Sequence, residues 1–408
     1  MAVMRGGEAA SPEGPRSRRC IVLFSYGFRP FFLLAGLWAI VPMVTLLWSL
    51  GIQSWPGDAI PLFRWHAHEL IFGFVSAAIA GFLLTAVPSW TGQPAVSGPR
   101  LTALVAIWAA ERIIVSPLIE LPAAVALPLE VTFLPALGLA LAVPLLRARK
   151  TANVVFLFFL GLLFAADLIF HMQLHGLTGS LPFDSLRAAL NVVLLMVVTI
   201  GGRIIPAFTR NALQQLGRPA ETAAPSWLNA AAIGTVALII VADLIDQDSL
   251  LSGLLAALAA LLLLARLAHW QGHRTLDVPL LWVLHLGYGW IVIGLALKAL
   301  WLLAANYWAV NWMHALNSGA FATMILAVTT RAALGHTGRA LEVPRVIAVA
   351  YLLVSVAAAT RVWGPVALPA YLWETTYVAG GLWVTGFALY VAVYCPILLG
   401  ARVDGKPG

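Results

Sequence analysis

Long apolar runs joined by short polar connections fill almost the whole chain. A helix needs about 20 apolar residues to cross the hydrocarbon core of a bilayer. Twelve runs of roughly that length are present, at about 31–50, 66–88, 101–119, 126–146, 152–173, 186–207, 226–246, 249–268, 279–302, 308–332, 344–362 and 371–399. The alternating segments of about ten residues that build membrane β-barrels are absent from the sequence. The pattern predicts an all-α, polytopic membrane protein, with one transmembrane domain at 29–400 between tails at 1–28 and 401–408.

The composition agrees with this pattern and excludes several classes of protein. Of the 408 residues, 61% are hydrophobic and 10% are charged, whereas an ordinary soluble domain carries about 25% charged residues. So few charges could not cover the surface of a soluble fold of this size. A soluble enzyme and a nucleic-acid-binding module are therefore excluded. Two cysteines, Cys20 and Cys395, are too few for a disulfide framework.

The basic residues predict the orientation of the helices and explain the net charge of +7. If the N-terminus lies in the cytoplasm, nineteen of the 24 Lys and Arg residues fall on the cytoplasmic side. Cytoplasmic loops carry such an excess, so we expect both termini inside and an even number of spans. The polar segment 1–28 is expected to be a disordered cytoplasmic tail and not a cleavable signal peptide.

Nine histidines stand out in this apolar chain. Ionisable groups within a membrane are costly and are functional candidates by default. Five of the nine come from three predicted spans and lie near the outer side, with His314 roughly 9 Å deep: His66, His68, His171, His175 and His314. His285 lies at a similar depth from the inner side. The remaining three, His269, His273 and His336, lie in or beside cytoplasmic connections.

The spacing of these residues narrows their roles. Asp167, His171 and His175 follow at i, i+4 and i+8 and therefore share one helix face. His66 and His68 are about 200° apart around a regular helix, so they are poor joint ligands for one ion. One could bind a haem and the other a different metal, because neutral imidazole suits haem iron and copper. Each histidine taken alone could equally be an interfacial or hydrogen-bonded residue.

Other polar positions leave alternatives open. Arg203, in GGRIIPAFTR, could close a kinked helix or clamp an anion such as a haem propionate. Lys298 could extend to the outer surface or hold a propionate. Glu111 and Arg112 are expected to pair with each other or with a neighbouring helix. The sequence lacks a phosphate-binding loop, so a nucleotide-driven pump is not expected. It also lacks a CxxCH stretch, which predicts that any haem is bound non-covalently.

Four stretches resemble the signature stretches of one family. They read RPFFLLAGLWA, WHAHELIFGF, GGRIIPAFTR and HALNSGAFATMILAVTTRAALGHTGR, in the order expected for the NnrS family. The resemblance covers nearly the whole chain. It implies a bacterial inner-membrane protein that contains haem b and copper and acts in denitrification and in the response to nitric oxide stress.

The resemblance also assigns residues to motifs. It covers His66, His68, Glu69, Arg203, His314, Arg331 and His336. Leu70 stands where a methionine often follows WHAHE in the family, a departure that does not touch the histidines. The HPE stretch and the adjacent histidine pair of terminal oxidases are missing, so turnover by analogy with those enzymes does not follow. Histidines that open the second and tenth spans nevertheless resemble the haem ligands of those enzymes in position.

We expect haem ligation by His68 and His314, with His66 as a further candidate and with Arg203 or Lys298 near the propionates. We expect metal ligands among His171, His175, His66 and His285. The remaining polar candidates are Glu69, Asp167, Arg331 and His336.

The resulting hypothesis is a haem- and copper-binding inner-membrane protein that binds or detoxifies nitric oxide near the periplasmic face. Whether this includes a redox reaction is left open. The expected partners are nitric oxide or a related small molecule, the lipid bilayer, and an electron donor or respiratory complex, but no nucleic acid. One alternative is a secondary transporter whose histidines and Asp167 relay protons or hold an ion. Another is an assembly factor for a respiratory complex.

Overall fold

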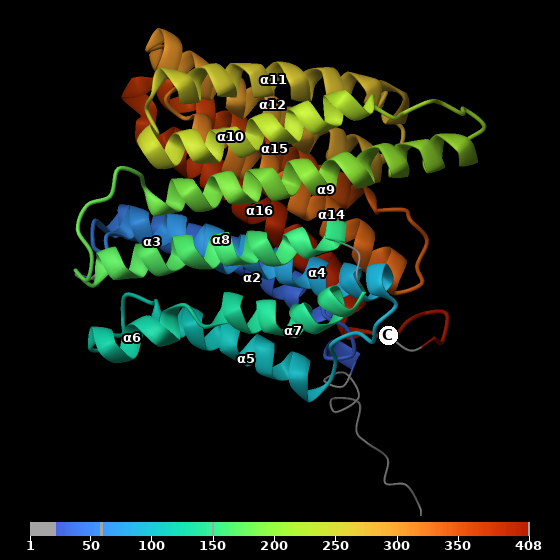
Figure 1. Cartoon of the computed structure of the whole chain (residues 1–408), viewed down its shortest axis with the longest axis horizontal. Coiled ribbons are helices and arrows are strands. Elements are labelled where there is room, and N and C mark those ends of the chain that lie inside the picture. The colour runs from blue at the N-terminus through green and yellow to red at the C-terminus, as the bar shows by residue number, and fades with distance from the viewer. Residues whose placement is uncertain (1–21, 58–59, 149–150, 407–408) are drawn as a thin grey trace, which may run out of the picture.

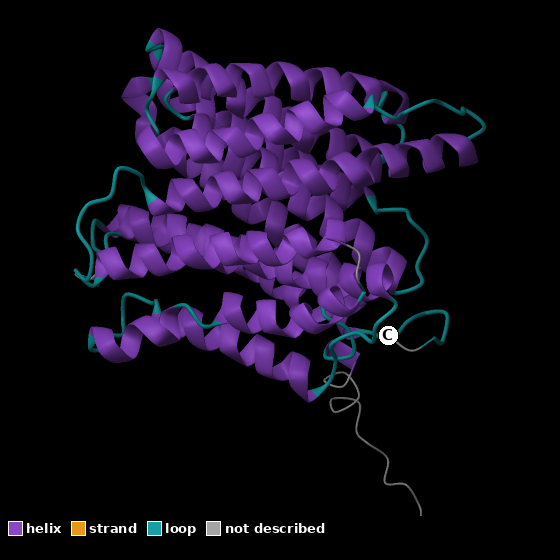
Figure 2. Cartoon of the chain, viewed as in Figure 1, coloured by secondary structure: helices purple, strands orange, loops and turns teal. Residues whose placement is uncertain are grey.

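The computed structural model describes residues 22–57, 60–148 and 151–406, and within these ranges the regular elements are helices, without strands (Figure 2). The first half contains α2 (Phe28–Ile52), α3 (Leu62–His68), η1 (Glu69–Val75), α4 (Ser76–Thr91), α5 (Pro99–Ile114), α6 (Ala123–Glu130), α7 (Phe133–Arg147), α8 (Thr151–Leu174) and α9 (Ser185–Gln215). The second half contains α10 (Ser226–Asp246), α11 (Leu250–His269), η2 (Gly272–Thr275), α12 (Pro279–Ala304), η3 (Tyr307–Ala309), α13 (Trp312–His314), η4 (Ala315–Phe321), α14 (Ala322–His336), α15 (Arg345–Ala367), η5 (Pro369–Tyr371) and α16 (Leu372–Leu399).

Eleven helical segments in the described part of the chain are long and apolar enough to cross a membrane, and one of them, Ala123–Arg147, is divided into α6 and α7. This confirms a polytopic all-α membrane protein. The helices lie side by side, with α9 between the N-terminal helices and α10–α12 (Figure 1). The segment Leu62–Thr91, formed by α3, η1 and α4, is the most buried of the eleven. It therefore forms the centre of the bundle and not its lipid-facing rim.

The apolar run at 101–119 forms a shorter helix than the predicted membrane span. It forms α5, which has 16 residues and would be about 24 Å long at the helical rise. The helix ends at Ile114 because Pro117 follows shortly after, and a residue before proline is pushed out of the helical conformation. α5 runs beside α6 and α7 at the edge of the bundle (Figure 1). The predicted set of twelve spans thus consists of eleven long helices and this shorter one.

The two ends of the chain can be compared with the predicted tails at 1–28 and 401–408. Residues 1–21 of the predicted N-terminal tail lie outside the described part, and α2 begins at Phe28. At the other end, Arg402 Nη1 donates to the carbonyl of His336 at 2.7 Å, and the Val403 amide donates to Thr337 at 3.2 Å. The segment after α16 therefore packs on the end of α14.

Two helix pairs in the bundle are built alike. α2 is followed by α3, η1 and α4, and α12 is followed by α13, η4 and α14. In each pair the second helix contains a seven-residue π-helix that begins directly after a histidine, His68 or His314. Gly73 and Gly319 stand five residues after these histidines. A side chain on either glycine would overlap a tryptophan of the preceding helix, Trp38 or Trp290. The second and tenth predicted spans therefore resemble each other in structure as well as in sequence, since each has a histidine, a π-helix and a closely packed glycine in the same order.

Candidate metal centre

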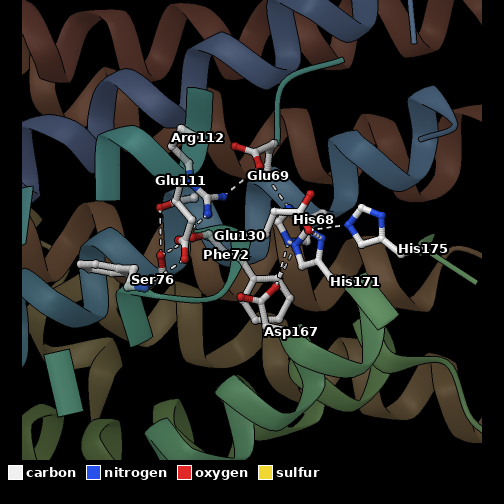
Figure 3. Close-up of polar contacts among 12 residues, drawn as sticks. His68, Glu69, Phe72, Ser76, Glu111, Arg112, Glu130, Asp167, His171 and His175 are labelled. Carbon is white, nitrogen blue, oxygen red and sulfur yellow. Dashed lines mark hydrogen bonds and ion pairs between the residues drawn. The ribbon is translucent and has the colours of Figure 1, made fainter. Parts of the chain in front are cut away.

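Buried ionisable side chains gather where α3, η1, α5, α6 and α8 meet (Figure 3). The group consists of His68, Glu69, Glu111, Arg112, Glu130, Asp167, His171 and His175. All are buried except His175, whose side chain is 17% exposed. Inside a bundle that crosses a membrane, such groups persist only when they are paired or hold an ion. We call this group the carboxylate–histidine cluster.

His68 lies at the centre of the cluster, and both of its ring nitrogens have close neighbours. Its Nε2 is 2.9 Å from Oδ1 of Asp167 and 3.2 Å from Nε2 of His171. Its Nδ1 is 3.1 Å from Oε1 of Glu69. The Nε2 atoms of the two histidines and the Asp167 oxygen lie within 4.8 Å of one another, and all three side chains are buried. This triplet can bind one metal ion.

A second triplet adjoins the first. Oε2 of Glu130 is 2.7 Å from Nε2 of His175 and 3.0 Å from Nδ1 of His171. Glu130 is the last residue of α6, where the helix breaks before Phe133 begins α7. Glu130 is not among the site residues expected from the sequence. The available signal was its position as a carboxylate within a predicted apolar span, which is costly unless the group has a partner.

Glu69 is fixed by side chains from two other helices, α2 and α5. Its Oε2 accepts a hydrogen bond from Trp38 Nε1 at 2.6 Å, and its Oε1 accepts from Arg112 Nη1 at 2.8 Å. Arg112 Nη2 donates to Glu111 at 2.7 Å, and Glu111 in turn accepts from the Phe133 amide at 2.9 Å. The expected pairing of Glu111 with Arg112 is thus present. A carboxylate held in this way can orient His68, as carboxylates do behind metal-binding histidines.

The buried ion pairs of Arg112 are expected to stabilise the folded protein. Arg112→Met would leave two carboxylates buried without their cation, and breaking a buried ion pair in this way costs about 3–5 kcal/mol. We expect a clearly lower midpoint of thermal unfolding for the purified variant in detergent. The matched control is Arg64→Ala, which removes a 3.1 Å pair with Asp184 that is 42% and 34% exposed. Such exposed pairs contribute about 0–1 kcal/mol, so equal losses for the two variants would contradict this account.

His66 and His314 both lie outside the carboxylate–histidine cluster. Nδ1 of His66 is 3.1 Å from the carbonyl oxygen of Pro42 in α2, which leaves its Nε2 without a hydrogen-bond partner in the described part of the chain. The guanidinium of Arg361, in α15, acts electrostatically on both histidines, and His66 acts on His314. Both rings are half-buried. The structure therefore gives His66 different neighbours from those of His68.

The other predicted residues lie elsewhere. Lys298 pairs with Asp243 at 2.6 Å and lies over the Trp312 ring. Nε2 of His285 is 3.0 Å from the hydroxyl of Thr209, and His285 belongs to neither metal-binding triplet of the described residues. Arg203 is exposed. None of these three is brought to the cluster.

Arg331 and His336 line a cavity of about 330 Å³ at the ends of α4 and α14. Arg331 stacks on Phe208, at 3.9 Å from the ring centroid, and the His336 ring packs against Phe28. The cavity includes Trp90, which follows His68 by 22 residues on one continuous helical segment, or about 33 Å. Arg331 and His336 are therefore remote from the carboxylate–histidine cluster.

The fold and the cluster define a multi-pass membrane protein with a buried group of side chains suited to a metal ion. The model of a known family, NnrS protein, matches residues 22–402. The chain belongs to the NnrS family, as the four sequence stretches predicted. Membership indicates a membrane protein of the nitric oxide response. A comparison with curated proteins gave no match.

Proposed function

We propose that this protein is a bacterial inner-membrane protein that holds copper and haem b and binds or detoxifies nitric oxide. The observation that carries the proposal is the buried triplet of His68, Asp167 and His171 in a chain of the NnrS family. Imidazole and carboxylate are ligands for copper and for neighbouring divalent metals, and copper is the metal that the family resemblance implies.

The charge of the cluster favours a bound cation. Four carboxyl groups, those of Glu69, Glu111, Glu130 and Asp167, share the single guanidinium of Arg112 within the cluster. A buried excess of negative charge in a low-dielectric bundle is unfavourable unless a proton or a metal ion offsets it. In addition, Nδ1 of His171 is buried without a hydrogen bond of good geometry. The donor atoms and the charge of the cluster therefore both suit a divalent metal ion.

The haem is assigned to His66 and His314. A histidine that ligates iron through Nε2 commonly uses its Nδ1 to contact a backbone carbonyl, and His66 has this arrangement with Pro42. His314 approaches from another helix, and Arg361 offers a positive charge for a propionate. His66 and His314 would hold a non-covalent haem in this place, and the haem would supply electron exchange. The sequence instead predicts that His68 and His314 hold one haem. This pairing stays a prediction, and the haem contents of His68→Ala and His66→Ala distinguish it from the pairing of His66 with His314.

The location follows from the helix ends. α3, α6 and the C-terminal end of α8 lie at the same end of the bundle (Figure 1). If both termini are cytoplasmic, as the basic residues predict, this end is periplasmic. Nitric oxide that arrives from the periplasm or dissolves in the lipid would then reach the copper site over a short path.

Nitric oxide uptake tests the proposal. We expect the reduced, copper-loaded protein to bind nitric oxide under anaerobic conditions, as followed with a nitric oxide electrode. We expect His68→Ala, loaded and reduced in the same way, to lose most of this uptake. Equal uptake by the two proteins would contradict a role of the cluster in binding nitric oxide.

A further inference from the structure

We propose that the carboxylate–histidine cluster is a two-metal centre in which the ring of His171 bridges the two ions as an imidazolate, whose ring proton is released when the second ion binds. This inference rests on the proposed metal-binding function of the cluster and adds a second site to it. One ion would be held by His68, Asp167 and Nε2 of His171. The other would be held by Glu130, His175 and Nδ1 of His171.

The two nitrogens of His171 face separate sets of ligand atoms (Figure 3). Nε2 is 3.2 Å from His68 Nε2 and 3.6 Å from Asp167 Oδ1. Nδ1, on the other side of the ring, is 3.0 Å from Glu130 Oε2. The His171 side chain is fully buried. One side chain therefore belongs to both triplets.

Hydrogen bonding alone leaves this arrangement incomplete. A neutral imidazole has one donor and one acceptor nitrogen. The Nδ1 atom of His171 lies within ion-pair distance of Glu130 but without hydrogen-bond geometry, and it counts as a buried atom without a partner. Such atoms are rare in native proteins and call for an explanation such as an ion. An ion between Nδ1 and Glu130 provides one.

The local sequence explains why the two sites share a residue. Asp167, His171 and His175 stand one helical turn apart on a single face of α8. The central residue, His171, thus has one potential ligand on each side along the helix. Each side is completed by one residue of another helix: His68 from α3 beside Asp167, and Glu130 from α6 beside His175.

The ligand sets indicate the class of ion. Each site offers one carboxylate, one imidazole and one nitrogen of the shared ring. Three protein ligands leave a position open for water or a small ligand, as in catalytic zinc sites. Nitrogen and oxygen donors of this kind suit copper and zinc. His68 is fully buried whereas His175 is 17% exposed, so we expect the His175 site to exchange its ion more readily.

The metal content of the full-length protein, purified and loaded with Cu(II), tests the inference. We expect two ions per wild-type chain, one in His175→Ala, one in Glu130→Gln and none or one in His171→Ala. The control is His269→Ala, which changes an exposed histidine that contacts the carbonyl of Ala265; it should keep two. Size-exclusion chromatography identifies any variant that fails to fold, and Glu130→Gln provides a nearly isosteric replacement.

Electron paramagnetic resonance adds the evidence for a bridge. Two Cu(II) ions joined by one imidazole ring should couple, so that the integrated copper signal of the wild type is smaller than its copper content. In His175→Ala the signal should equal the copper content. One ion in the wild type, with no change in His175→Ala, would overturn the bridge and leave the proposed function intact. Two uncoupled ions would also overturn the bridge. No ion in any form would overturn both proposals.

Discussion

Replacement of His68 by alanine is expected to remove copper from the site formed with Asp167 and His171, while haem stays bound. His68 is fully buried and supplies one of the three ligand atoms of this site, so its loss leaves the ion with only two protein ligands. The measurement is copper per chain by mass spectrometry after removal of loosely bound metal, with haem measured from the Soret absorption of the same sample. Glu69→Gln should have a smaller effect. This variant keeps His68 as a ligand but removes the carboxylate that Arg112 and Trp38 hold in place to orient His68. The loss of such an orienting group reduces metal affinity about 10–100-fold.

His66→Ala is the matched control, because it removes a histidine two residues away on the same helix. His66 contacts Pro42 and not the cluster, so this variant should keep its copper. If instead His68→Ala loses haem and His66→Ala keeps it, then His68 is a haem ligand. The division of the histidines proposed above is then wrong, and the pairing expected from the sequence is correct.

Replacement of His314 by alanine is expected to abolish the Soret absorption, with little change in copper content. His314 directly precedes the π-helix η4, and Arg361 and His66 act on it electrostatically. π-Helical turns are rare and occur frequently at functional sites. With one of the two proposed haem-binding histidines removed, the haem should be held weakly and lost on purification. The double variant His66→Ala/His314→Ala should bind no haem at all.

His336→Ala is the control for this prediction. His336 also belongs to a family motif, but it lies beside the cavity of Arg331 at the other end of the bundle. We expect this variant to keep its haem. Loss of haem in His336→Ala, with full haem in His314→Ala, would place the haem in the cavity of about 330 Å³ lined by Arg331 and His336.

The sequence predicted the parts of this structure that depend on local periodicity. Apolar runs determine where long helices form, since each run needs only its own residues to satisfy its backbone. The shared face of Asp167, His171 and His175 follows from the helical repeat in the same way. α5 was the exception because its end depends on Pro117 and not on hydrophobicity.

The remaining features depend on how separate helices pack. Glu130 joins His171 because α6 ends beside α8, and no pattern within 126–146 indicates that contact. Lys298 was expected to extend to the surface or to meet a propionate, yet it pairs with Asp243 because α10 and α12 bring the two together. The separation of His66 from His68 was expected from their angle, but the partners of each became known only from the positions of α2 and α8.

The most direct test of the central claim is the copper and iron content of the wild-type protein, purified in detergent from cells supplied with both metals. This account predicts at least one copper ion and one haem iron per chain. A transporter that uses the same histidines as proton relays, or an assembly factor that acts without metal, would be purified with neither. A folded wild-type protein that contains no stoichiometric copper, and takes up none on loading, would contradict the account.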